Sequence, residues 1–125
     1  MNVLSRYLDR IASIVRHSEA IDDTVTYRQL TPDLATMEGV LVFYDGSRLD
    51  FTEVIQLTKQ TIHKQRYRYQ YVKDDQTVFR YDNSPHHLHL STFPHHKHDA
   101  SSRILESDEV ALEDVLAEIS TILAR

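Results

Sequence analysis

Cysteine and tryptophan are absent from this 125-residue sequence, and glycine and proline are scarce, with two and three residues. Without cysteine the chain has no disulfide scaffold, no zinc site with thiolate ligands and no thiol nucleophile. No apolar run approaches the roughly 18 residues that a transmembrane helix needs. Charges throughout residues 1–20 also interrupt the apolar stretch that a secretory signal requires. We therefore expect a cytoplasmic protein with no membrane partner, folded as one domain over residues 1–125.

Negative charge predominates in the chain as a whole, with a formal net charge of −5. The charge is unevenly spread, because residues 59–81 contain six Lys or Arg against two Asp, whereas residues 21–58 and 99–125 are strongly acidic. A local basic stretch attracts phosphate groups even on an acidic protein. Residues 59–81 therefore favour a nucleic-acid surface, although the same charges also suit a solvated sheet face.

The spacing of apolar residues predicts a helix at each end of the chain and strands between them. Helical periodicity covers residues 4–15 and 108–123. Alternating β-branched and aromatic residues separated by turn residues predict strands over residues 24–30, 39–44, 49–57, 61–73 and 76–81, and residues 87–90 could form a sixth. We expect an α+β fold, in which an antiparallel sheet of five or six strands carries the N-terminal and C-terminal helices on one face. Three tyrosines share one parity in strand 61–73 and are expected to face a helix rather than to stack on bases: Tyr67, Tyr69 and Tyr71.

Histidine is the overrepresented residue type, and six of the eight histidines fall between His86 and His98. Imidazole can both give and take a proton near neutral pH, so several histidines in one pocket favour acid–base chemistry. If residues 86–90 are extended, His87 and His89 share a face and lie about 7 Å apart. Residues 82–102 also contain two prolines and little periodicity, which is typical of a structured functional loop.

Three hypotheses account for this histidine segment. The first is a phosphodiester-cleaving site that needs neither metal nor cofactor, with His96 and His87 as the acid–base pair and Arg80 and Lys97 on the phosphate. Its candidate catalytic residues are the histidines of this segment and Arg80, and its candidate RNA-binding residues are Arg66, Arg68, Tyr81 and Lys97. The second hypothesis is a histidine-rich metal site, although the spacing matches no standard zinc signature. The third is a structural role in a non-catalytic interaction protein.

The sequence words F-R-Y-D-N-S-P-H-H at 79–87, T-F-P-H-H-K-H at 92–98 and L-E-D-V-L-A-E-I at 112–119 resemble the TumE family of prokaryotic toxin–antitoxin toxins. The D-G-S turn at 45–47 and the R-Y-R-Y-Q-Y run at 66–71 are also similar to that family, and the likeness spans residues 40–119. By this resemblance the motif histidines are His86, His87, His95, His96 and His98, which with Arg80 are the candidate catalytic residues. His89 lies outside these words.

The resemblance implies a cytoplasmic toxin of a type II pair that is neutralised by direct binding of a cognate antitoxin. In such pairs the antitoxin is commonly a helix-turn-helix DNA-binding protein. Many toxins of this size are ribonucleases that inhibit translation, so by analogy the resemblance favours an RNA endonuclease.

Overall fold

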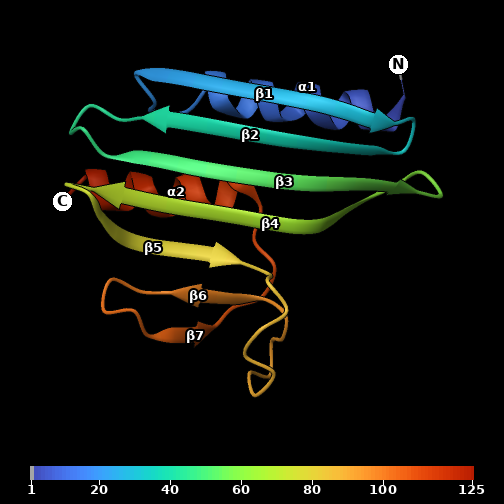
Figure 1. Cartoon of the computed structure of the whole chain (residues 1–125). Helices are drawn as coiled ribbons and strands as arrows, with labels where there is room; N and C mark the ends of the chain where they lie inside the picture. The colour runs from blue at the N-terminus through green and yellow to red at the C-terminus, as the bar shows by residue number, and fades with distance from the viewer. Residues whose placement is uncertain (1) are drawn as a thin grey trace.

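Each strand of the sheet pairs antiparallel with the next strand along the chain, so the seven strands form a meander in the order β1-β2-β3-β4-β5-β6-β7 (Figure 1). The computed structural model describes residues 2–125. The strands are β1 Asp22–Thr31, β2 Leu34–Val42, β3 Arg48–Thr58, β4 Thr61–Lys73, β5 Gln76–Asp82, β6 His96–His98 and β7 Ile104–Glu106. The helices are α1 Val3–Arg16 and α2 Leu112–Leu123, which confirms the predicted α+β class with a helix near each end.

Both helices cover the same face of the sheet, behind the strands in Figure 1. The core lies between these layers, because alternate strand residues point toward the helices. The largest of these buried side chains come from β2 to β5: Met37, Leu41, Phe51, Tyr69, Tyr71 and Phe79. The predicted parity of the three tyrosines is confirmed, since Tyr67, Tyr69 and Tyr71 are all buried. Neither helix, within residues 2–125, is long and apolar enough to cross a membrane.

Local chemistry explains where the helices begin. The Asn2 side chain caps α1 by accepting a hydrogen bond from the Ser5 amide at 2.8 Å. Helix α2 begins at Leu112, four residues after the predicted start, and the Val110 carbonyl just before it accepts a hydrogen bond from the Lys64 ammonium. Asp114 accepts a hydrogen bond from the Ala111 amide at 2.9 Å and so fixes the first turn.

The predicted count of five or six strands was wrong, because the sheet has seven. The segment expected as the sixth strand, 87–90, is a turn in which His87 has a φ of 61° and the Leu90 amide donates to the His87 carbonyl at 3.1 Å. Strands β6 and β7 extend the sheet instead, and each has only three residues. Three residues are too few to produce a detectable alternation in sequence.

A buried carboxylate joins α1 to the middle of the sheet. Glu53 on β3 is 1% exposed, and it accepts hydrogen bonds from the Tyr7 hydroxyl of α1 and, at 2.5 Å, from the Tyr69 hydroxyl of β4. Burial, and then the Glu53 charge, raise the pKa of both tyrosines, so both keep the protons that they donate. Helix α1 is therefore fixed to β3 and β4, while most side chains of β1 remain exposed.

The close approach of β2 to the Phe51 ring gives a test of the core. Gly39 lies opposite Phe51, and a Cβ at residue 39 would lie 2.2 Å from the Cε1 atom of that ring. Because Phe51 is only 2% exposed, the ring cannot swing into solvent. We expect Gly39→Ala to lower the free energy of unfolding by about 2 kcal/mol in urea denaturation.

Gly46 provides the matched control. Nothing lies within 4 Å of a Cβ at this position. Its φ is +84°, a backbone conformation that asparagine tolerates better than most residues do. Gly46→Asn should therefore cost less than about 1 kcal/mol. Equal stability of Gly39→Ala and the wild type would contradict this account of the contact.

Candidate functional site

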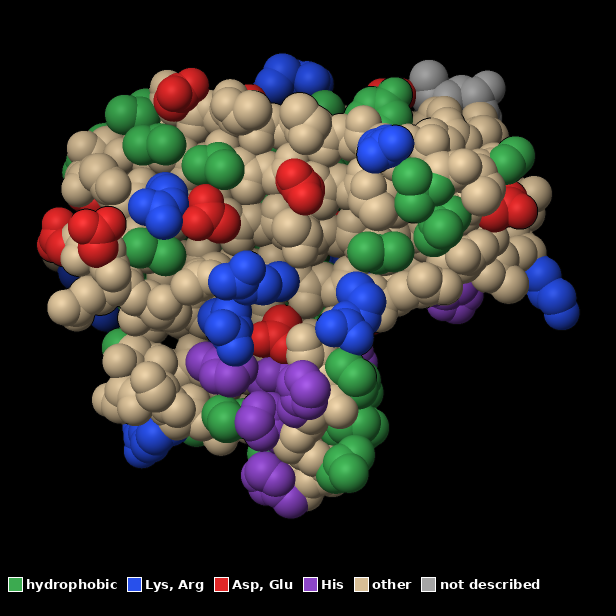
Figure 2. All heavy atoms as spheres, viewed as in Figure 1, with side chains coloured by type: hydrophobic (Ala, Val, Ile, Leu, Met, Phe, Trp, Pro, Cys, Tyr) green, Lys and Arg blue, Asp and Glu red, His purple; other side chains and the backbone are tan. Residues whose placement is uncertain are grey.

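The candidate site lies on the sheet face that the helices do not cover, at the end where β5 and β6 pair. The antiparallel register places Arg80 opposite His98 and Asp82 opposite His96. Alternation along β5 and β6 puts these four side chains on one face. His87 reaches the same place from the loop that follows β5, and its left-handed backbone directs the chain back over the strands. Figure 2 shows the histidines gathered on this face below a group of Lys and Arg side chains.

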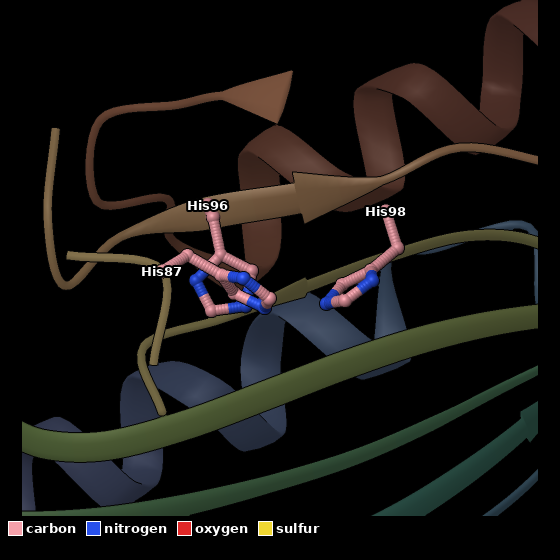
Figure 3. A group of neighbouring side chains, drawn as sticks. All are labelled: His87, His96 and His98. Carbon is pink, nitrogen blue, oxygen red and sulfur yellow. The ribbon is translucent and has the colours of Figure 1, made fainter. Parts of the chain in front are cut away.

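Three imidazoles converge in this site (Figure 3). The ring centroids are 5.0 Å apart for His87 and His96, 4.9 Å for His96 and His98, and 6.0 Å for His87 and His98. One ring nitrogen from each lies within 4.8 Å of those of the other two. The loop and the strand, which are separate in sequence, therefore supply one cluster.

Asp82 is the anion at the centre of the cluster and is 4% exposed. Its Oδ1 atom accepts from the Ser84 amide at 2.9 Å and lies 2.9 Å from His96 Nε2, and its Oδ2 atom accepts from Arg80 Nε at 3.0 Å. Burial alone would raise the pKa of Asp82. The Ser84 hydrogen bond and the charges of His96 and Arg80 outweigh burial and lower the pKa, so the group is a carboxylate at neutral pH.

His96 is enclosed by acceptors on both sides. Its Nδ1 atom lies 2.9 Å from the Pro94 carbonyl oxygen, and its Nε2 atom faces Asp82. Both partners are hydrogen-bond acceptors, so both ring nitrogens of His96 are engaged within the protein. The side chain is only 2% exposed. The geometry therefore favours His96 as a positioning residue rather than as the proton-transfer group expected from the sequence.

His87 and His98 are the more accessible members of the cluster. His98 Nε2 lies 2.8 Å from an Arg80 guanidinium nitrogen and 3.5 Å from Asp82 Oδ2. Partial burial and then the Arg80 charge lower the pKa of His98. Partial burial and then the neighbouring His96, His89 and His86 lower that of His87. Both rings therefore lose their protons at a lower pH than a free imidazole does, and both can serve in acid–base chemistry.

Arginine side chains form the remainder of the site. A cavity of about 350 Å³ is lined by Arg66, Arg68, Arg80 and Ser84, together with Thr52, Tyr67 and Asp82. A second cavity, of about 410 Å³, lies on the other side of Arg80 and includes His98, Gln76 and Thr77. Arg66 and Arg68 form no ion pair within residues 2–125, so their charges are available to an anionic ligand.

Two expected RNA-binding residues, Tyr81 and Lys97, lie on the opposite face of the sheet from the histidine cluster, because they alternate with the site residues along β5 and β6. The Tyr81 hydroxyl and the Lys97 ammonium both bind Glu118 of α2, at 2.6 and 2.8 Å. Each is therefore on the helix-covered face, and Lys97 is not placed to share a phosphate with Arg80.

The other candidate histidines lie around the cluster without joining it. His95 is stacked against Tyr67, whose hydroxyl lies 2.8 Å from His95 Nδ1. His86 and His89 are exposed, and their ring centroids lie 6.3 and 6.1 Å from that of His87.

Two functional features were missed by sequence reasoning. Asp82 is part of the word F-R-Y-D-N-S-P-H-H but has no role in the sequence-based hypotheses, although its spacing of two residues from Arg80 places it on the same strand face. Asn83 follows β5, accepts a hydrogen bond from the Tyr67 amide at 2.9 Å and donates one to the Gln65 carbonyl at 3.0 Å. This side chain continues the pairing beyond the strand and fixes the start of the loop that carries His87.

The cluster also has the composition of a metal site, because three imidazoles and a carboxylate converge. A tetrahedral zinc ion would need these nitrogens about 3.4 Å apart and their lone pairs free. The Arg80 guanidinium instead occupies the side of His98 Nε2 and adds a positive charge, while His96 is bonded on both nitrogens. These contacts favour an anion over a cation.

Comparison with known proteins gives one match. The model of the family described as Toxin TumE matches residues 8–123, which is nearly the whole chain. No curated protein and no solved structure matches. The matched range includes all the candidate site residues and both words of the histidine motif.

Removal of the Asp82 charge tests whether the cluster depends on it. We expect Asp82→Ala to lower the free energy of unfolding by about 3 kcal/mol, because it leaves the buried His96 and Arg80 without their anion. Arg66→Ala is the matched control on the same face, and because Arg66 is exposed it should change stability by less than about 0.5 kcal/mol. Urea denaturation measures both, and an Asp82→Ala variant as stable as the wild type would show that the carboxylate is dispensable.

Proposed function

The chain belongs to the TumE toxin family, and we propose that it is the toxin of a type II toxin–antitoxin pair and acts as a metal-independent RNA endonuclease that inhibits translation. The observation that carries the proposal is the convergence of His87, His98 and the Arg80 guanidinium on an exposed face bordered by further arginines. This combination provides two proton-transfer groups and a cation for phosphate, which are the parts needed to cleave RNA through its own 2′-hydroxyl.

The proposed reaction has two proton transfers. His87 takes the proton of the 2′-hydroxyl, and the 2′-oxygen forms a bond to phosphorus. As the bond from phosphorus to the 5′-oxygen breaks, protonated His98 gives its proton to that oxygen, which leaves a 2′,3′-cyclic phosphate and a 5′-hydroxyl. His87 is assigned as the base because no other side chain bonds its ring within the described residues. His98 is assigned as the acid because, once the phosphate has drawn Arg80 away from its Nε2, Asp82 Oδ2 at 3.5 Å is the neighbour that stabilises its protonated form.

The cations and His96 support this reaction without transferring protons. Arg80 donates hydrogen bonds to the phosphate oxygens, whose charge grows as the fifth bond to phosphorus forms. A phosphate that binds Arg80 also draws the guanidinium away from His98 Nε2. Arg66 and Arg68 bind the phosphates that flank the reacting one, along the 350 Å³ cavity. His96 and Asp82 hold the two working rings in place.

The family implies a cognate antitoxin, and we propose that this partner is a helix-turn-helix DNA-binding protein encoded beside the toxin. An RNA-cleaving toxin of this kind works in the cytoplasm, where its substrate is. Cloning of the adjoining gene and co-purification of its product with this chain test the proposal. A neighbouring product that neither binds the chain nor relieves growth arrest would contradict it.

Substitution of the two working histidines tests the mechanism. We expect His87→Ala and His98→Ala each to reduce RNA cleavage by about 10²- to 10⁴-fold and to abolish growth arrest on expression. His89→Ala and His86→Ala are matched controls from the same loop, and both should keep most of the wild-type activity because neither ring joins the cluster. Cleavage should persist in EDTA.

Each contrary result supports a different alternative. Loss of cleavage in EDTA would indicate a metal site at the histidines. Growth arrest that is unchanged in His87→Ala and His98→Ala would exclude the acid–base mechanism. RNA that stays intact while the antitoxin binds would indicate a non-catalytic interaction protein.

The pH dependence of cleavage follows from the lowered pKa values of the two histidines. Activity requires a neutral His87 and a protonated His98, so the rate should be bell-shaped in pH. Because both pKa values lie below the ordinary 6.5, the maximum should fall below about pH 6.5. The pH profile is measured from initial rates of cleavage of a labelled RNA between about pH 4 and 9, which spans the titration of imidazole. A flat profile would contradict the assignment of His87 and His98.

A further inference from the structure

Strand β1 leaves a long edge of the sheet unpaired. It has ten residues, hydrogen-bonds to β2 on one side and forms one end of the strand order. Nine of its positions are exposed, and only Val25 is partly buried. An exposed strand edge of this length presents a row of backbone donors and acceptors that can pair with another strand.

Apolar side chains accompany this open edge. Ile21 is 68% exposed, Tyr27 61% and Leu30 49%, although each is large and apolar. Beside Tyr27 lies a groove of about 520 Å³ between α1 and β1, lined by Leu8, Asp9, Ala12 and Val25 among others. Helix α1, which forms one wall of this groove, is fixed to β3 by the hydrogen bond from Tyr7 to Glu53.

The sequence of β1 is complementary to itself when two copies run antiparallel. With Val25 on a two-fold axis perpendicular to the sheet, Asp22 lies opposite Arg28 of the second copy, and Thr24 lies opposite Thr26 of the second copy. Tyr27 then lies opposite Asp23 of the second copy, and the two Val25 residues meet. Two opposite-charge pairs and a pair of β-branched residues each stabilise an antiparallel ladder. Neither Asp22 nor Arg28 has an ion-pair partner within residues 2–125.

We propose that β1 is a dimerisation edge and that its occupant is β1 of a second copy of this chain. The pairing joins two seven-stranded sheets into one continuous sheet. Because the axis is perpendicular to the sheet, both pairs of helices lie on one side and both histidine clusters lie on the other. The clusters are at the two far ends, since β5 and β6 are distant from β1 in the strand order. The dimer does not depend on the proposed ribonuclease activity.

A charge swap tests the proposed register. Asp22→Arg or Arg28→Asp places like charges opposite each other at two symmetric points, and each should raise the dimer dissociation constant about 30-fold in sedimentation experiments on the isolated chain. The double variant Asp22→Arg/Arg28→Asp restores both pairs and should return the constant to within about threefold of the wild type. Single variants that dimerise like the wild type, or a double variant that fails to recover, would overturn the proposal.

Cysteine cross-linking tests the position of the two-fold axis, and the absence of native cysteine makes the result unambiguous. Val25→Cys should form an intermolecular disulfide on mild oxidation, because the two residues at the axis face each other. Thr26→Cys is the matched control, since its counterpart is diagonal to it and too far away to be bridged.

The remaining outcomes each decide against the proposal. Cross-linking of Thr26→Cys without Val25→Cys would overturn the register. A chain that stays monomeric, with β1 protected from hydrogen exchange only when the antitoxin is added, would assign the edge to the antitoxin and overturn the dimer.

Discussion

The candidate site depends on one buried charge, the Asp82 carboxylate. A carboxylate removed from water needs several donors to offset its lost hydration, and here the donors are the Ser84 amide, Arg80 and His96. Those contacts fix the strand end, the guanidinium and one imidazole in a single arrangement, and His87 and His98 lie against it. The same anion keeps positive charge close together in a small volume. Arg80 and His98 both approach Asp82, so the carboxylate offsets the Arg80 charge beside the imidazoles.

Much of the fold could be predicted from alternation and turn residues. Strand 61–73 was predicted with its observed bounds, and both helices and the placement of Tyr67, Tyr69 and Tyr71 were confirmed. Strands β6 and β7 were missed because each has only three residues and is defined by pairing, β6 with β5 and β7 with β6, rather than by a pattern in its own sequence. Strand β2 was predicted to begin at residue 39 and begins at Leu34, since Pro32 and Asp33 form a tight hairpin turn.

For the candidate site, the sequence indicated the neighbourhood but not the assignment of roles. The histidine motif drew attention to the segments that supply His87, His96 and His98, which the fold brings together. What the linear pattern could not supply was the register between β5 and β6, which sends His96 and His98 to one face and Lys97 to the other. Nor could it show that His96 would be bonded on both ring nitrogens, because one partner is a carbonyl in the loop and the other lies on the adjacent strand.

Strand β4 explains why the core and the basic surface occur together. Because side chains alternate along the strand, Tyr67, Tyr69 and Tyr71 point into the core. Arg66 and Arg68 point to the open face. The Tyr69 hydroxyl donates to the buried Glu53 and the Tyr71 hydroxyl donates to the buried Ser47, so the strand cannot slip without breaking buried hydrogen bonds. A one-residue slip would exchange the two faces, burying arginine and exposing tyrosine. Core packing therefore fixes the positions of the arginines beside the histidines. The hydrogen bond from the Tyr67 amide to Asn83 also fixes the start of the loop that carries His87.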